Sequence, residues 1–112
     1  MYHNGIGVEE DNKKRVYHLE EAAIGGHPIA RHDLGCVENE NRRVDRAMKH
    51  WLIAAKLGDD VSLQALSLSF AQGFMRKEEY EAALRGHQAA VDATKSEQRD
   101  AAEEFFKQLN QR

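Results

Sequence analysis

The stretch AAIGG at residues 22–26 returns 32 residues later as AAKLG at residues 54–58. The echo continues beyond the two stretches, because Leu34 is matched at the same distance by Leu66. A fixed period of this length is typical of stacked helical repeats. Such stacks form extended binding surfaces, so the period favours a protein that holds another macromolecule.

Apolar side chains recur at helical spacing through the chain, and glycine and proline divide them into segments. The pair Gly25-Gly26 ends one helix because glycine accepts the left-handed backbone of a helix C-terminus. Pro28 suits the first position of the next helix, where a missing N–H costs nothing. Near the C-terminus, Ser96 suits an N-cap, so we expect a break at residues 93–96, with one continuous helix as the alternative. The predicted helices cover residues 12–24, 28–38, 44–57, 60–73, 76–93 and 96–110.

Composition limits the class of protein. The chain has 112 residues, of which 41% are hydrophobic, and a net charge of −3, which suits one domain without the basic surface of a nucleic-acid binder. The single cysteine, Cys36, excludes an intrachain disulfide. The first residues lack a signal-peptide pattern, and no apolar run approaches the ~20 residues that span a bilayer. We therefore expect a soluble, cytoplasmic or otherwise intracellular protein that binds neither membranes nor nucleic acids.

Several short motifs together resemble the Sel1-like repeat family, a relative of the tetratricopeptide repeats. The family pattern has a Gly-x-Gly-Val-x-x-Asp stretch, a helix and then Ala-Ala-x-x-Gly. The second copy lacks the glycine loop, and the third has Ser67 where the pattern has glycine. The residues that carry the resemblance are Tyr2, Gly5, Gly7, Val8, Asp11, Ala22, Ala23, Gly26, Ala30, Leu34, Gly35, Trp51, Ala54, Ala55 and Gly58.

The resemblance implies an all-α fold in which antiparallel helix pairs stack as a short superhelix, or solenoid. The chain is then one domain, with a C-terminal capping helix and with residues 5–7 as the turn between two helices. Gly35 permits a close helix crossing, and Trp51 is a large wedge between neighbouring repeats. The expected units are a partial repeat at 2–29, a repeat at 30–61, a degenerate repeat at 62–93 and the cap at 96–110.

The resemblance also implies a function, which is protein–protein interaction as an adaptor or scaffold. In repeats of this type the concave face is formed mainly by the first helix of each pair, here residues 28–38 and 60–73. We expect a partner peptide or domain to bind there without catalysis or a cofactor. The residues expected to point outward on that face are Arg31, His32, Glu38, Leu63, Gln64 and Ser67.

The N-terminal edge is a second expected interface. Tyr2 aligns with the end of a helix whose earlier residues are absent, so the next helix lacks a partner on its outer side. We expect either that the chain ends a longer array or that this edge packs against another chain, including a second copy. The apolar residues of the edge are Tyr2, Val8, Val16 and Tyr17.

The chemistry-bearing residues favour a non-enzyme. His32 and Cys36 lie one helical turn apart, but a structural zinc site needs four ligands and no second pair is present. The same two residues with Asp33 do not make a nucleophilic site, since nothing in the sequence orients the histidine. The basic runs at residues 13–15 and 42–43 have acids nearby and suit a solvated helix face, with an acidic peptide ligand as the alternative.

Three other functions are weighed against the adaptor. The chain suits a C-terminal, substrate-recruiting module of a longer protein whose activity, such as a zinc-binding interaction domain, lies elsewhere. An autonomous enzyme has no supporting constellation of residues. RNA binding by helical repeats is opposed by the acidic balance and by the shortage of aromatic residues for base stacking.

Overall fold

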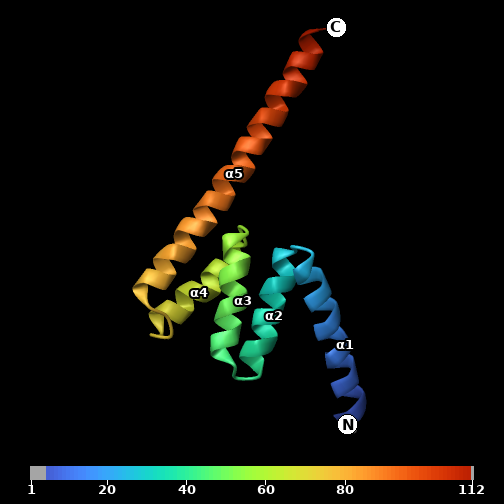
Figure 1. Cartoon of the computed structure of the whole chain (residues 1–112), viewed down its shortest axis with the longest axis vertical. Coiled ribbons are helices and arrows are strands. Elements are labelled where there is room, and N and C mark those ends of the chain that lie inside the picture. The colour runs from blue at the N-terminus through green and yellow to red at the C-terminus, as the bar shows by residue number, and fades with distance from the viewer. Residues whose placement is uncertain (1–4, 112) are drawn as a thin grey trace.

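The computed structural model describes residues 5–111, which fold into α-helices joined by short connections and contain no strand (Figure 1). The predicted all-α class is therefore confirmed. α1 begins earlier than expected, and α2 and α4 differ from their expected C-terminal ends by two residues. The helices are α1 (Gly5–Ile24), α2 (Pro28–Glu40), α3 (Val44–Lys56), α4 (Asp60–Ala71) and α5 (Lys77–Asn110).

The helix α3 lies at the centre of the packed part of the molecule, against α2, α4 and α5. Alanines on its inner side are fully buried, and their small side chains let the neighbouring helices approach closely. Leu66 of α4 fills the space beside them and is also fully buried. The main core consists of Ala47, Trp51, Ala55, Leu66, Met75 and Ala83.

The repeated sequence stretches have matching geometry. Gly26 and Gly58 both adopt the left-handed backbone, with φ of +92° and +100°. The N–H of Gly26 donates to Ala23 and that of Gly58 donates to Ala55, at 3.0 and 2.9 Å. After each glycine one extended residue leads into the next helix, so α2 and α4 begin 32 residues apart. The sequence period therefore corresponds to a period of local structure.

Gly35 makes the crossing of α2 and α3 close, as the sequence predicts, and Trp51 lies in this crossing within the expected repeat at 30–61. Trp51 is 7% exposed, and a Cβ at Gly35 would lie 2.6 Å from Cδ1 of the indole. The indole Nε1 also donates to the carbonyl oxygen of His32, at 3.3 Å. Only glycine fits at position 35 without moving the indole.

The predicted break at residues 93–96 is wrong, because α5 runs unbroken through it. The segment contains no glycine or proline, and the Thr94 hydroxyl donates to the carbonyl of Ala90 within the helix, at 3.1 Å. The separate capping helix at 96–110 is wrong for the same reason. Residues 92–111 are all exposed, so this half of α5 covers no other described helix.

The N-terminal turn predicted at residues 5–7 is also wrong, since these residues open α1. Tyr2 lies outside the described residues, and the side chain of Val8 is not among those described. α1 packs chiefly on α2, through a small cluster of Ala23, Ala30 and Leu34. Its other end diverges from α2 toward the N-terminus, and α5 extends to the opposite end of a molecule 67 Å long (Figure 1).

Candidate functional site

Four of the six residues predicted on the concave face do not point freely outward. Arg31, His32 and Glu38 are half-buried because α2 is covered by α1 on one side and by α3 on the other, and Leu63 of α4 is also half-buried. Leu63 packs against the main core. Gln64 and Ser67 are exposed. The full exposure expected of the other four is not observed, and Arg31 and Glu38 line a hollow beside α1.

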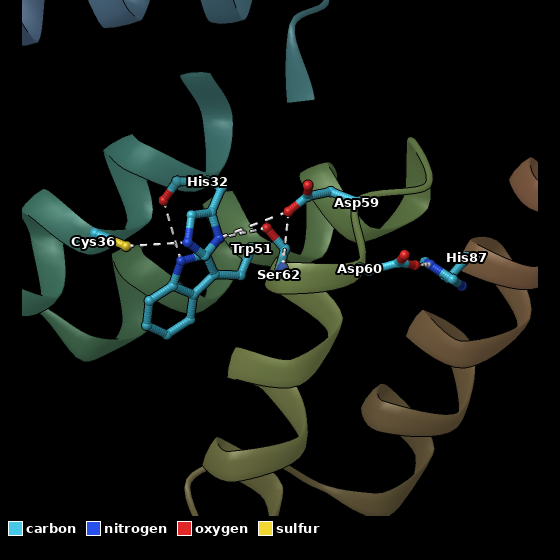
Figure 2. Close-up of polar contacts among 7 residues, drawn as sticks. All are labelled: His32, Cys36, Trp51, Asp59, Asp60, Ser62 and His87. Atoms are coloured by element: carbon cyan, nitrogen blue, oxygen red, sulfur yellow. Dashed lines mark hydrogen bonds and ion pairs between the residues drawn. The ribbon is translucent and has the colours of Figure 1, made fainter. Parts of the chain in front are cut away.

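His32 lies in a polar junction between α2, α3 and α4 (Figure 2). Its Nδ1 is 2.8 Å from the hydroxyl of Ser62, and its Nε2 is 3.4 Å from the Cys36 sulfur. Asp59 accepts a hydrogen bond from the Ser62 N–H at 2.8 Å and caps α4, with its carboxylate 3.8 Å from Nδ1 of His32. Ser62 is fully buried, and the contacts above give each of these polar groups a partner within the protein.

In the junction Ser62 and Asp59 orient His32, a role for which the sequence alone indicated no residue. The junction does not activate Cys36. Burial raises the pKa of the Cys36 thiol above its usual value, while the hydrogen bond with the Trp51 side chain acts in the opposite sense. A reactive cysteine needs a lowered pKa, because the thiolate is the nucleophile. The arrangement therefore joins three helices rather than preparing a nucleophile.

A second polar contact connects α4 to α5. The Nε2 of His87 lies 2.6 Å from the carboxylate of Asp60, and the His87 side chain is 13% exposed (Figure 2). Gly86, one residue earlier, lies against the side chain of Lys56 on α3. This half of α5 is therefore fixed to the packed helices.

Among the residues that the structure describes, no group of three or more histidine, cysteine or acidic side chains could hold a metal ion. The described helices include none that is long and apolar enough to cross a membrane.

A groove of about 710 Å³ lies between α1 and the turn that joins α2 to α3. We call it the α1 groove. Its apolar surface comes from Val16, Tyr17 and Val37, of which Tyr17 is 59% exposed. The edge residues Val16 and Tyr17, predicted from sequence, thus lie in it. The complete lining is Asn12, Lys13, Arg15, Val16, Tyr17, Glu20, Val37, Glu40, Asn41 and Arg43.

The two basic runs of the sequence meet at the α1 groove. Lys13 and Arg15 line it from α1, and Arg43 lines it from the opposite wall. Arg42 precedes Arg43 in a tight turn and has a φ of 61°, which is uncommon for a residue with a side chain. The Arg43 N–H donates to the carbonyl of Glu38 at 2.8 Å and holds this turn. Both runs are visible in the sequence, but the groove that they share could not be predicted, because it depends on the angle between α1 and α2.

A smaller hollow of about 420 Å³ continues the α1 groove toward α3 and shares Val16 and Arg43 with it. Three buried polar atoms on its walls have no hydrogen-bond partner: Nε of Arg31, Oε2 of Glu38 and Nδ1 of His50. Arg43 lies 3.5 Å from that Glu38 oxygen as an ion pair, but without hydrogen-bond geometry.

His50 shows the electrostatic character of this wall. Burial lowers the pKa of its imidazole below the usual value, and the nearby positive charge of Arg31 lowers it further. The neutral form is therefore favoured near neutral pH, and one ring nitrogen faces the hollow without a partner.

Comparison with known proteins yields no match to a family model, to a curated protein or to a solved structure.

Proposed function

We propose that the chain is a Sel1-like helical-repeat module, with its helix pairs stacked as a short superhelix, that binds another protein and has no catalytic role. The observation that carries the proposal is the α1 groove, which combines apolar surface with basic side chains on both walls. The matching turns at Gly26 and Gly58 support the repeat architecture. The half-buried Cys36, whose thiol pKa is raised, and the paired His32 favour binding over catalysis.

The chemistry of the α1 groove also defines the partner. Val16 and Tyr17 offer apolar contact, and an amphipathic helix buries its apolar face in a groove of this kind. Lys13, Arg15 and Arg43 favour acidic residues beside that face, since complementary charge sets specificity and speeds association. The partner is therefore an acidic amphipathic helix, rather than a ligand on the face that Gln64 and Ser67 expose.

The test is photo-cross-linking from inside the α1 groove. Benzoylphenylalanine replaces Tyr17 in one protein and Ile29, which is 70% exposed on the first turn of α2, in a control. We expect residue 17 to cross-link acid-rich segments with apolar residues at helical spacing, and Lys13→Glu/Arg15→Glu to abolish that capture. Equal capture from position 29, or capture that survives the charge reversal, would overturn the proposed site.

A further inference from the structure

The outer half of α5, residues 92–111, packs on no other described helix, and we call it the α5 tail. Its first turns, at Thr94, Lys95 and Gln98, border a hollow next to Leu57 and Gly58. All residues of the tail are exposed, and its helical part, residues 92–110, is roughly 30 Å long at a rise of about 1.5 Å per residue. Phe105 and Phe106 are 58% and 61% exposed, and Leu109 is 43% exposed. Large apolar side chains gathered on one helix face usually mark an interaction site.

The apolar residues of the α5 tail form one stripe. Ala101, Ala102, Phe105, Phe106 and Leu109 recur at a spacing of three or four residues, so they share a face of the helix. The rings of Phe105 and Phe106 meet edge to face, with centroids 6.0 Å apart. The α5 tail thus has the form that an apolar groove accepts.

The charge of the α5 tail is opposite to that of the α1 groove. Residues 92–111 contain five acidic and three basic side chains, and Glu103 and Glu104 lie beside the phenylalanines. The α1 groove has Lys13 and Arg15 on one wall and Arg43 on the other. The lining of the groove also includes Glu20 and Glu40, so its three basic and two acidic side chains leave one net positive charge beside the apolar surface. The tail is an amphipathic helix with two more acidic than basic side chains.

The α5 tail cannot enter the α1 groove of its own chain. α5 is one unbroken helix whose first half is fixed against α3 and α4, and its tail points away from the packed helices. The α1 groove is lined by α1 and the turn between α2 and α3, and the N-terminal end of α1 and this turn lie far from the C-terminus (Figure 1). Any pairing of the two must therefore join different copies.

We propose that the chain self-associates, with the α5 tail of one copy in the α1 groove of another. This inference rests on the proposed function, because it names the partner of the groove described there. The phenylalanine stripe lies on Val16, Tyr17 and Val37, and the acidic residues beside it meet the basic walls. In a dimer of two copies that exchange tails, both grooves are filled and both apolar stripes are covered.

The test is a charge exchange measured by sedimentation equilibrium. The groove variant is Lys13→Glu/Arg15→Glu, and the tail variant is Glu103→Lys/Glu104→Lys. All four residues are exposed, so circular dichroism should show unchanged helix content. We expect the wild type to exceed its monomer mass of 12.7 kDa, and each variant alone to associate at least about tenfold more weakly.

Mixing the two variants gives the sharpest result. Each groove then meets a tail of opposite charge, so the mixture is expected to associate although neither variant does so alone. A matched control, Glu78→Lys/Glu81→Lys, makes the same change in net charge on the packed half of α5 and is expected to associate as the wild type does.

Each contrary result has one meaning. A wild type that stays monomeric at all concentrations overturns self-association, and groove cross-links to a foreign acidic helix would leave the proposed function standing. Association that survives both single reversals, or variants that do not rescue each other, also overturns the pairing of tail and groove. A monomeric chain without groove cross-links would refute both the inference and the proposed function.

Discussion

The packed helices α2–α4 and the α5 tail have similar helical sequence patterns but opposite surroundings. Ala47, Ala54 and Leu66 are fully buried, whereas Phe105 and Phe106 at comparable spacing are more than half exposed. Helical periodicity shows which residues share a face, but not whether another element covers that face. In the packed region another helix of the chain covers that face, and in the α5 tail no described element covers it.

The α1 groove combines features of the packed region and of the open region. The C-terminal half of α1 packs on α2, while its outward side exposes Tyr17 beside the basic residues. The molecule thus presents an open groove at one end and an open apolar helix at the other. The comparison predicts that mutations in the packed helices change stability, and that mutations in the α5 tail change association.

The largest expected effect is at Trp51. Replacing it by alanine removes the side chain that fills the crossing of α2 and α3, and such changes cost about 3–5 kcal/mol of unfolding free energy. Phe106→Ala in the α5 tail is the contrasting change, with an expected effect within about 0.5 kcal/mol in dilute protein. Urea denaturation measures both. Similar losses for the two variants would contradict the division into packed and open regions.

The next largest effect distinguishes alanine substitutions at two glycines within helices, Gly35 and Gly86. Gly35→Ala places a Cβ against the rigid indole of Trp51 and is expected to cost about 1–3 kcal/mol. Gly86→Ala places a Cβ 2.8 Å from Cγ of Lys56, whose exposed side chain can rotate, and gains up to about 1 kcal/mol of helix propensity that offsets this cost. A clearly larger fall in denaturant midpoint is expected for Gly35→Ala than for Gly86→Ala. A neutral Gly35→Ala would mean that the crossing is looser than described.

A smaller effect is expected at the cap of α4. Asp59→Ala removes the acceptor of the Ser62 N–H and should cost about 1 kcal/mol. Asp59→Asn keeps an acceptor oxygen and should restore most of the loss. If both variants lose the same amount in thermal denaturation, the charge beside His32 matters more than the cap.

The smallest effect is the pH dependence contributed by His50. Its pKa is lowered in the folded protein, so the unfolded chain binds the proton more readily. Stability is therefore expected to fall as the pH drops below the unfolded pKa of about 6.5. The loss due to His50 is complete only below its folded pKa. His50→Gln should show less acid destabilisation than wild type between pH 7 and 5 in urea titrations. Identical pH profiles would contradict the assignment.

Much of the packed region was predictable from sequence, because its determinants are local. Gly26, Gly58 and Pro28 mark helix ends through backbone conformation alone, and Gly35 with Trp51 indicated the close crossing. The break at residues 93–96 was not predictable from Ser96, since a serine can cap a helix or lie within one. The surrounding residues all tolerate a helix, and α5 continues.

The candidate site was harder to predict because it depends on angles between helices. The basic runs at residues 13–15 and 42–43 were visible, but their common groove arises from the way α1 diverges from α2. The half-buried positions of His32 and Leu63 arise from packing on both sides of their helices. Helical phase alone placed them outward.

Amide hydrogen exchange at increasing protein concentration tests most directly whether the two open regions cover each other. The account predicts that amides of residues 92–110 and of the α1 segment around Tyr17 become protected together as concentration rises, while those of α3 stay unchanged. The groove variant Lys13→Glu/Arg15→Glu should abolish the concentration dependence at both sites. Exchange in the α5 tail that stays fast at every concentration, or protection that ignores the charge reversal, would contradict the account.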